Sequence, residues 1–333
     1  MKAQTAVQMM YNTMRLRNER PKTIKSYLHY FKRFIAHIKI SPAGSTPEEL
    51  VRSFLTRIVI NENVSATTQK VAMCSIVYFF KRVIQKPLGD FSGYHRATKA
   101  KNIPVVLSRE EAGRFIDSLS GIALLWGYFM YGCGLRLGEV CALRVKDIDF
   151  DRRQIAICDA KGGKYRYVLM PERMVPELER HMRNLRRIYE EYAARRVPVS
   201  LPYALDRKYP NAPYEYGWFY LFPATEPIKM HPGRRQDPAW IGKLHHIHES
   251  AIQKRVKRAY AEVGITKKAG CHTLRHSYAT HWLEQAEGAH EVALLRLGKL
   301  LGHGSPKTTL IYLHCIKHKS DVASPLDTLG RAA

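Results

Sequence analysis

Residues 271–282 read CHTLRHSYATHW, and this stretch decides the fold class that we expect for the chain. Its His272 and Arg275 are three residues apart, so they share a face if the stretch is helical. Leu274, Tyr278 and Trp282 follow a neighbouring stripe at helical spacing, which we expect to face the core. The stretch therefore predicts a helix that packs on one side and presents an imidazole and a guanidinium on another.

Two further segments hold cationic or imidazole side chains in settings that expose them. Residues 132–139 read GCGLRLGE and present Arg136 after a Gly-x-Gly turn. A Leu-Gly-His303-Gly turn precedes Tyr312 by nine residues. Taken singly, each has an ordinary interpretation, because an arginine after such a turn is usually a surface residue and a single histidine is usually a satisfied polar group. We expect Glu139 to be a structural partner that orients an arginine.

Strand-like alternation interrupts the helical pattern after Asp147. Ile155 and Ile157 lead into the turn Lys161-Gly162-Gly163-Lys164, and alternating apolar residues follow it, namely Tyr165, Tyr167 and Leu169. A Gly-Gly turn between alternating segments predicts a β-hairpin. The expected fold is thus mainly α-helical, with a small β-hairpin or sheet in the second of two domains.

Chain length and pattern together predict two domains, since 333 residues exceed the usual size of one. Residues 1–92 are interpreted as helices with basic faces, including a helix start at Thr46-Pro47-Glu48-Glu49. Residues 93–106 lose the apolar period and form a basic linker, whose Lys99 and Lys101 we expect to follow a phosphate backbone. A capping box at Ser108-Arg109-Glu110-Glu111 opens the second domain, residues 107–333.

The net charge is the most unusual bulk property, because 54 Lys and Arg stand against 29 Asp and Glu, a formal charge of +25. This excess indicates a polyanionic partner, and nucleic acid fits because many distributed cations can bind its phosphates and release their counterions. Basic surfaces that bind nothing specific are the alternative. Because the first residues lack the apolar core of a signal peptide and no apolar run could span a membrane, we expect a cytoplasmic protein. The six cysteines have no metal-site spacing and are interpreted as reduced core residues.

The order of the polar residues along the second domain resembles the catalytic set of the tyrosine recombinases. That set is Arg136, Lys161, His272, Arg275, His303 and Tyr312. One such motif could arise by chance, but an ordered series is specific. The resemblance covers both domains, and it implies a two-domain, C-shaped clamp that closes on DNA.

Phosphodiester chemistry explains why these residue types are needed. Two guanidiniums, from Arg136 and Arg275, can each donate paired hydrogen bonds to the oxygens of a phosphate, so no metal or other cofactor is required. Tyr312 would attack in line and form a 3′-phosphotyrosyl intermediate, which preserves bond energy and needs no ATP. A hydrolase would usually carry a metal-binding carboxylate cluster, and none is evident in the sequence.

The resemblance also assigns roles to the remaining residues of the set. Lys161 would protonate the departing 5′ oxygen, whereas Lys164 on the other side of the turn would contact a backbone phosphate. His272 would serve as an acid-base group or a phosphate ligand, and His303 would donate a hydrogen bond to the scissile phosphate.

An irregular, proline-rich and aromatic segment at about 198–240 narrows the resemblance to the integron integrases. The runs LHHIH at 244–248 and SPLD at 324–327 look like the same subgroup. The subgroup recognises folded single-stranded attC hairpins through unpaired bases and also acts on duplex attI sites, in a synapse of four protomers. The resemblance places base contacts on Trp218, Pro232, His245 and His246, because such rings can stack on bases. Two alternatives stay open, that Trp218 only packs the insertion against the domain and that the histidines bind metal.

Two features depart from the family pattern. The stretch between Arg275 and His303 is several residues longer, and an insertion inside a helix would rotate everything that follows it unless the excess loops out near Gly288. Leu313 also replaces the threonine that usually follows the nucleophile. We therefore keep two other hypotheses, a DNA-binding homologue without catalysis and an Xer-like or phage-type recombinase that acts on duplex sites.

Overall fold

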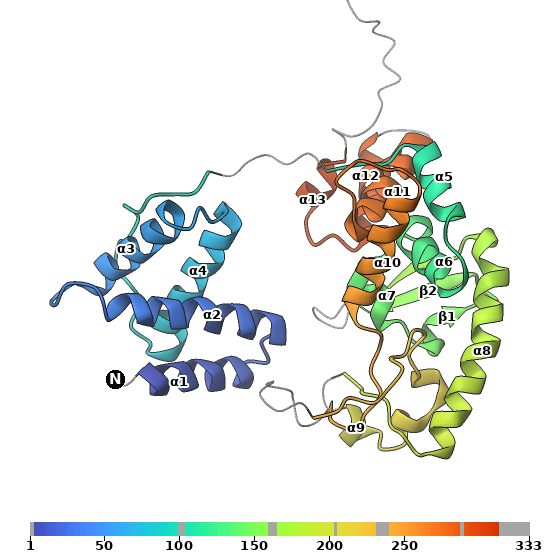
Figure 1. Ribbon diagram of the computed structural model, residues 1–333, viewed down its shortest axis with the longest axis horizontal. Coiled ribbons are helices and arrows are strands. Elements are labelled where there is room, and N and C mark those ends of the chain that lie inside the picture. The colour runs from blue at the N-terminus through green and yellow to red at the C-terminus, as the bar shows by residue number, and fades with distance from the viewer. Residues whose placement is uncertain are drawn as a thin grey trace, which may run out of the picture. The chain divides into compact units, whose positions relative to one another are not determined.

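The structure is a computed structural model that describes residues 3–98, 104–158, 165–202, 205–230, 240–286 and 290–312. It divides into two compact units, Met1–Asn102 and Ile103–Ala333, and each is described by itself. Both units are built mainly of helices, and the second contains a sheet of three short strands (Figure 1). The predicted fold class, mainly α-helical with a small sheet in the second domain, is confirmed.

Four helices form the first unit, and their starts follow from the sequence. They are α1 (Ala3–Leu16), α2 (Pro21–Ile38), α3 (Pro47–Ile60) and α4 (Ala66–Tyr78), the last continuing into the π-helical turn η1 (Phe79–Val83). α3 begins with a capping box in which Thr46 and Glu49 bond each other's backbone N–H groups. The buried face of α2 carries Ile24, Leu28, Phe31 and Phe34, as its helical spacing predicts.

The segment that follows the last helix of the first unit is hydrogen-bonded to α3 and α4 as far as Ala97. Gln69 of α4, which is buried, donates to the His95 carbonyl at 2.6 Å and accepts from the Ala97 N–H at 2.9 Å. The His95 N–H donates to the Thr56 hydroxyl at 3.1 Å. The first part of the predicted linker is therefore fixed against α3 and α4, while Lys99 and Lys101 lie outside the described residues.

The second unit surrounds one helix that carries much of the polar set. Apart from the short helices of residues 205–218, its helices before that one are α5 (Arg109–Asp117), α6 (Gly121–Gly127) with the π-helical turn η2 (Tyr128–Gly132), α7 (Leu137–Ala142), η3 (Val145–Asp147), η4 (Glu172–Met174), α8 (Val175–Ala194) and α10 (Glu249–Glu262). The central helix is α11 (Cys271–Gln285), which contacts α5 and η2. Leu274 is buried and Tyr278 and Trp282 pack against buried residues, as predicted, while Thr273, Arg275 and Ser277 are buried as well, so α11 is enclosed on several sides.

The sheet pairs β1 (Ile148–Asp149), β2 (Gln154–Cys158) and β3 (Tyr165–Leu169), antiparallel and in that order. Ile157 of β2 is opposite Arg166 of β3, so the two longer strands form the predicted pair, and the Gly-Gly turn between them lies outside the described residues. Alternation along β3 turns Val168 to the core and leaves Tyr165, Tyr167 and Leu169 exposed. Cys158 is exposed at the end of β2, so the interpretation of every cysteine as a core residue was wrong.

The segment predicted as an irregular insertion contains only short helices among its described residues. These are α9 (Leu205–Lys208), η5 (Ala212–Tyr214) and η6 (Tyr216–Trp218), joined to the rest by single β-bridges such as Arg144 with Tyr220. Phe219, Tyr220, Leu221 and Phe222 are buried in the core of the unit. The apolar side chains of this stretch therefore complete the core of the second unit.

The extra residues before His303 do not shift a helix, because α11 ends at Gln285 and a separate helix, α12 (His290–Leu301), begins after them. α12 packs against α11 and the short α13 (Pro306–Leu310), as Figure 1 shows in orange and red. Leu297 and Leu301 of α12 are buried in one cluster with Tyr312. The packing of α12 against Tyr312 therefore helps to fix the position of this tyrosine. Within the described residues no helix is long and apolar enough to cross a membrane.

Candidate active site

A largely buried carboxylate, Glu139 of α7, lies at the centre of the polar set. Arg136, at the N-terminal cap of α7, donates to it from its backbone N–H and from Nη1, both at 2.8 Å. Burial raises the pKa of Glu139, but the hydrogen bonds and charges of Arg166 and Arg136 outweigh burial and hold this pKa below its ordinary value. Glu139 thus carries a negative charge at neutral pH and contacts an arginine, as expected.

Arg166 of β3 forms a bidentate ion pair with the same carboxylate. Its Nη1 and Nη2 donate to the two Glu139 oxygens at 3.0 and 2.7 Å, and its Nε donates to the Leu300 carbonyl at 2.8 Å. The bidentate pair is well buried, with 12% of the Arg166 side chain and 14% of the Glu139 side chain exposed. Arg166 therefore ties the sheet to both α7 and the end of α12.

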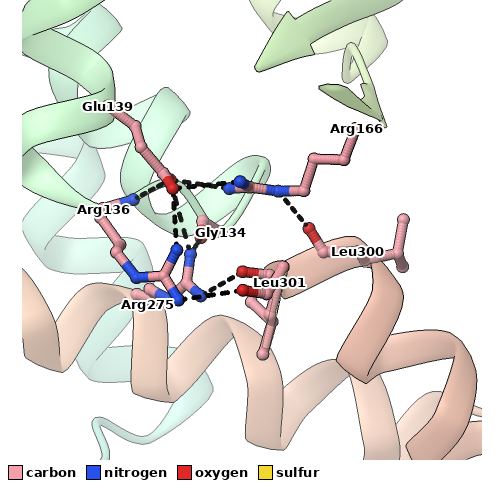
Figure 2. Close-up of polar contacts among 8 residues, drawn as sticks. Gly134, Arg136, Glu139, Arg166, Arg275, Leu300 and Leu301 are labelled. Carbon is pink, nitrogen blue, oxygen red and sulfur yellow. Dashed lines mark hydrogen bonds and ion pairs between the residues drawn. The ribbon is translucent and has the colours of Figure 1, made fainter. Parts of the chain in front are cut away.

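Arg275 of α11 is the third guanidinium in this group (Figure 2). Its Nη1 donates to the Gly134 carbonyl at 2.5 Å and its Nη2 to the Leu301 carbonyl at 2.6 Å. Nη1 also lies 3.7 Å from a Glu139 oxygen. Burial, and then the charge of Arg136, lowers the pKa of Arg275 to about 10, so the guanidinium stays protonated at neutral pH.

Two glycines allow the chain to pass close to these side chains. Gly134 and Gly302 have φ angles of +67° and +63°, a region that glycine adopts readily. A Cβ on Gly134 would collide with the ring of Tyr278, and one on Gly302 would lie 2.9 Å from Nη1 of Arg166. Both turns of the sequence motifs therefore require glycine.

Tyr312 follows α13 and is almost fully buried, with 2% of the residue exposed. Its ring lies nearly parallel to that of His303, with centroids 6.1 Å apart and planes at 15°. Its hydroxyl lies 3.1 Å from Nδ1 of His276 on α11. His303 is itself held by Thr309, whose hydroxyl lies 2.8 Å from the His303 Nδ1.

The two histidines beside Tyr312 are neutral at physiological pH. Burial, followed by the charges of Arg275 and Arg136, lowers the pKa of His303 to about 4. Burial, followed by the charges of His272 and Arg275, lowers the pKa of His276 to about 4. The site therefore combines permanent guanidinium charge with uncharged imidazoles.

The structure brings together four of the six residues in the predicted set, namely Arg136, Arg275, His303 and Tyr312. His272 lies on the same helix as Arg275, but its side chain is exposed. Lys161 and Lys164 lie outside the described residues, between β2 and β3 in the sequence.

Arg166 and His276 were not predicted from the sequence. Alternation places Arg166 on the same face of β3 as Val168, but only the structure shows that this face is the covered one, where a cation needs an anionic partner.

The predicted base-contacting residues lie around a second group of rings. The Lys146 ammonium lies 3.1 Å from the centre of the Trp218 ring, a cation–π contact within the unit. His245 packs against His246 and Trp240, with ring centroids 4.0 and 4.6 Å apart. Pro232 lies outside the described residues. The sequence had given no reason to select Trp240, of which 38% is exposed.

Burial and neighbouring charges keep His245 uncharged, and two hydroxyl groups lie at its ring nitrogen. Its Nδ1 lies 2.7 Å from the Ser200 hydroxyl and 3.2 Å from that of Tyr220. Burial, followed by His246 and Arg144, lowers the pKa of His245 to about 3. In the part of the chain that the structure describes, no three His, Cys, Asp or Glu residues are grouped to hold a metal ion.

The first group of residues can bind an anion next to a phenol. Arg136 and Arg275 supply cationic donors, Glu139 fixes their orientation, and the neutral imidazole of His276 lies beside the Tyr312 hydroxyl. Such donors stabilise charge that develops on a phosphate during transfer. The geometry is suited to moving a phosphoryl group to or from a tyrosine.

Comparison with known proteins gives matches over both units. Residues 123–319 match the phage integrase family, and residues 7–90 match the N-terminal SAM-like domain of phage integrases. An integrase/recombinase of Escherichia coli is 33% identical over 310 residues, which cover 92% of this chain and 89% of the relative. The tyrosine recombinase XerC of Halalkalibacterium halodurans is 25% identical over 317 residues, which cover 91% of this chain and 90% of the relative.

Solved structures of low sequence identity share the fold. XerH recombinase bound to a palindromic difH substrate has a TM-score of 0.62 at 20% identity, covering 94% of this chain and 82% of that one. Tn1549 transposon integrase in complex with transposon right end DNA has a TM-score of 0.60 at 14% identity, covering 97% and 96%. A lambda integrase dimer bound to a COC′ core site has a TM-score of 0.59 at 13% identity, covering 97% and 80%.

Proposed function

Because this chain belongs to the phage integrase family of tyrosine recombinases, we propose that Tyr312 is its nucleophile and that Arg136 and Arg275 bind the scissile DNA phosphate. The observation that carries this proposal is that both guanidiniums contact one buried carboxylate, while a pair of imidazoles lies against the tyrosine. Guanidiniums fixed in this way can bind phosphate oxygens without first reorganising.

The reaction begins with attack of the Tyr312 hydroxyl oxygen on phosphorus. A bond from that oxygen to phosphorus forms, the bond from phosphorus to the 5′ oxygen breaks, and the 3′ end stays attached to the protein. A 5′ hydroxyl from another strand then attacks the same phosphorus and releases the tyrosine. Each step exchanges one phosphodiester for another, so ligation needs no added energy source.

We assign the proton for the departing 5′ oxygen to Lys161, which the sequence places in the turn between β2 and β3, and a backbone phosphate contact to Lys164. His303 donates to the bound phosphate. His272, exposed beside Arg275 on α11, is an acid-base group or a further phosphate ligand. We also assign to Lys99 and Lys101 a contact with the DNA backbone.

For the substrate we propose gene-cassette sites of the integron type, folded attC strands and duplex attI, in a synapse of four protomers in the bacterial cytoplasm. The ring group of Trp240, His245 and His246 supports this choice, because neutral rings with an exposed edge can stack on an unpaired base. Trp218 and Pro232 are assigned to the same role. The Lys146 contact also supports a packing role for Trp218, which keeps that alternative open.

A duplex-specific recombinase is the second candidate. The solved relatives that share the fold include XerH on its difH substrate and lambda integrase on a core site. Binding of the folded bottom attC strand, its complement and the duplex should be compared at one salt concentration, because phosphate contacts dominate affinity. Preference for the folded strand supports cassette sites, and preference for the duplex supports this second candidate.

Covalent trapping tests the chemistry separately from the choice of substrate. On a nicked site the cleaved fragment diffuses away, so the protein should accumulate as a DNA adduct that survives denaturing electrophoresis. Tyr312→Phe should bind the same DNA and give no adduct. An adduct with this variant would show that Tyr312 is not the nucleophile, and no adduct with the unaltered chain on any site would support the DNA-binding homologue without catalysis.

A further inference from the structure

His276 is the imidazole that lies at the hydroxyl of Tyr312. Its Nδ1 lies 3.1 Å from the tyrosine oxygen, and the two ring centroids are 5.6 Å apart. His276 follows Arg275 directly in α11, so the same helix positions a phosphate-binding guanidinium and a partner for the nucleophile. His272, one helical turn earlier, has an exposed side chain.

We propose that His276 is the general base that removes the proton of Tyr312. This assignment rests on the proposed function, in which Tyr312 attacks DNA. It deepens that function by naming the atom that receives the proton, Nδ1 of His276. The sequence motif alone favoured His272 for acid-base work.

The atoms of the step balance without any additional reactant. The O–H bond of Tyr312 breaks as an N–H bond forms at His276, and the phenolate oxygen bonds to phosphorus. The P–O5′ bond breaks, and under the proposed function Lys161 supplies the proton that the 5′ oxygen takes up. In the return reaction His276 gives its proton back to the tyrosine oxygen, and the attacking 5′ hydroxyl gives its proton to the lysine.

The charges around His276 explain how the base is controlled. His272 and Arg275 face it from its own helix, His303 approaches from the turn after α12, and Tyr312 follows α13. Burial, and then these charges, lower the pKa of His276 and keep the ring neutral in the absence of DNA, with a lone pair available to the hydroxyl. The cations also oppose protonation of the ring, so the tyrosine stays in its protonated form until substrate arrives.

DNA would strengthen the base at the moment it is needed. A phosphate bound by Arg136 and Arg275 adds negative charge beside His276 and partly cancels the cationic field. The pKa of His276 therefore rises when the site is filled. Proton removal becomes coupled to phosphate binding, which protects a buried nucleophile from reacting in the free protein.

Two substitutions distinguish a His276 that accepts the proton of Tyr312 from one that only forms a hydrogen bond to it. His276→Asn keeps an acceptor oxygen near the position of Nδ1 but has no basicity, and His276→Phe removes both. The rate of adduct formation on a nicked site should fall by about 10²–10⁴-fold in both variants, the usual contribution of a general base. The rate of the unaltered chain should level off above the pKa of bound His276, whereas that of the Asn variant should keep rising with pH.

A substrate with sulfur at the 5′ bridging position provides the matched control for the acid. A thiolate leaves without protonation, so this substrate should restore Lys161→Ala but not His276→Asn. Restoration of His276→Asn would overturn the proposal, as would an Asn variant within twofold of the unaltered chain with the same pH profile. If that variant reacts normally while Tyr312→Phe does not, the base is wrong and the nucleophile stands. If the unaltered chain gives no adduct on any site, the proposed function and this assignment both fail.

Nitrogen NMR of the unaltered, histidine-labelled protein gives a test that does not depend on a variant folding. We expect a neutral His276 with an unprotonated Nδ1 at pH 7 without DNA. An imidazolium at that pH, or a proton on Nδ1, would contradict the assignment.

Discussion

Replacement of Glu139 by glutamine is the perturbation whose cost follows most directly from the structure. The carboxylate accepts four hydrogen bonds, two from Arg136 and two from Arg166, and lies 3.7 Å from Arg275. Glutamine keeps one acceptor oxygen and turns an NH₂ group toward guanidinium donors. Breaking a buried pair by removing one partner costs about 3–5 kcal/mol, so we expect a loss of that size in the free energy of unfolding.

Tryptophan fluorescence can follow this change in the second unit alone. The tryptophans, at 126, 218, 240 and 282, all belong to Ile103–Ala333. A loss of about 3–5 kcal/mol corresponds to a fall in Tm of roughly 6–20 °C for a unit of this size. Glu190→Gln, which breaks an exposed pair with Arg186 on α8, serves as the control and should change stability by less than about 1 kcal/mol.

The pH dependence of Glu139→Gln checks the cause of the loss. The pKa of Glu139 is lowered in the folded state, so its contribution is complete above its unfolded pKa, about 4.3, and is lost as pH falls through the folded value. The difference between the two proteins should therefore shrink below about pH 4. A Tm within 2 °C of the unaltered chain at pH 7, or a difference that grows in acid, would refute the reasoning.

Three further perturbations test other parts of the structure. Gly134→Ala should destabilise the second unit by more than about 2 kcal/mol in a denaturant titration, because the φ angle of Gly134 is positive and a Cβ there collides with the ring of Tyr278. Gly113→Ala in α5 is the control, because a Cβ there meets open space, and it should leave stability unchanged or raise it. Gln69→Ala should speed hydrogen exchange of the amides at 95–97, which it anchors, whereas the exposed neighbour change Lys70→Ala should not. Burial lowers the pKa of His245 in the folded protein to about 3, so below about pH 6.5 the unfolded chain binds more protons than the folded one. The free energy of unfolding should therefore fall as the pH is lowered from about 6.5 toward about 3, and His245→Gln should reduce this dependence. An unchanged pH dependence in the variant would contradict a neutral, buried His245.

The sequence was enough to locate several helices and strands, but not to predict which residues and faces of them are in contact. The proline after Thr46 located the start of α3, and a capping box located the start of α5, because these signals are local. The Gly-Gly turn likewise predicted the pairing of β2 with β3. Alternation alone could not say which face of β3 is covered, and its aromatic residues proved to be exposed.

The candidate site shows the same division. Order and spacing selected Arg136, Arg275, His303 and Tyr312, which the structure brings together. Arg166 was missed because its partner Glu139 lies on an element that is distant in sequence. His276 was missed because the motif emphasised the histidine before the arginine, whereas the direction of each side chain depends on how α11 is enclosed.

The identity of the residue that becomes linked to DNA is the most direct test of the account. The trapped adduct should be digested with nuclease and protease, and the peptide that retains a nucleotide should be sequenced by mass spectrometry. We predict a 3′-phosphonucleotide on Tyr312 and a fall in adduct of at least 10³-fold in Tyr312→Phe, as expected when a nucleophile is removed. A nucleotide on any other residue would contradict the assignment of Tyr312.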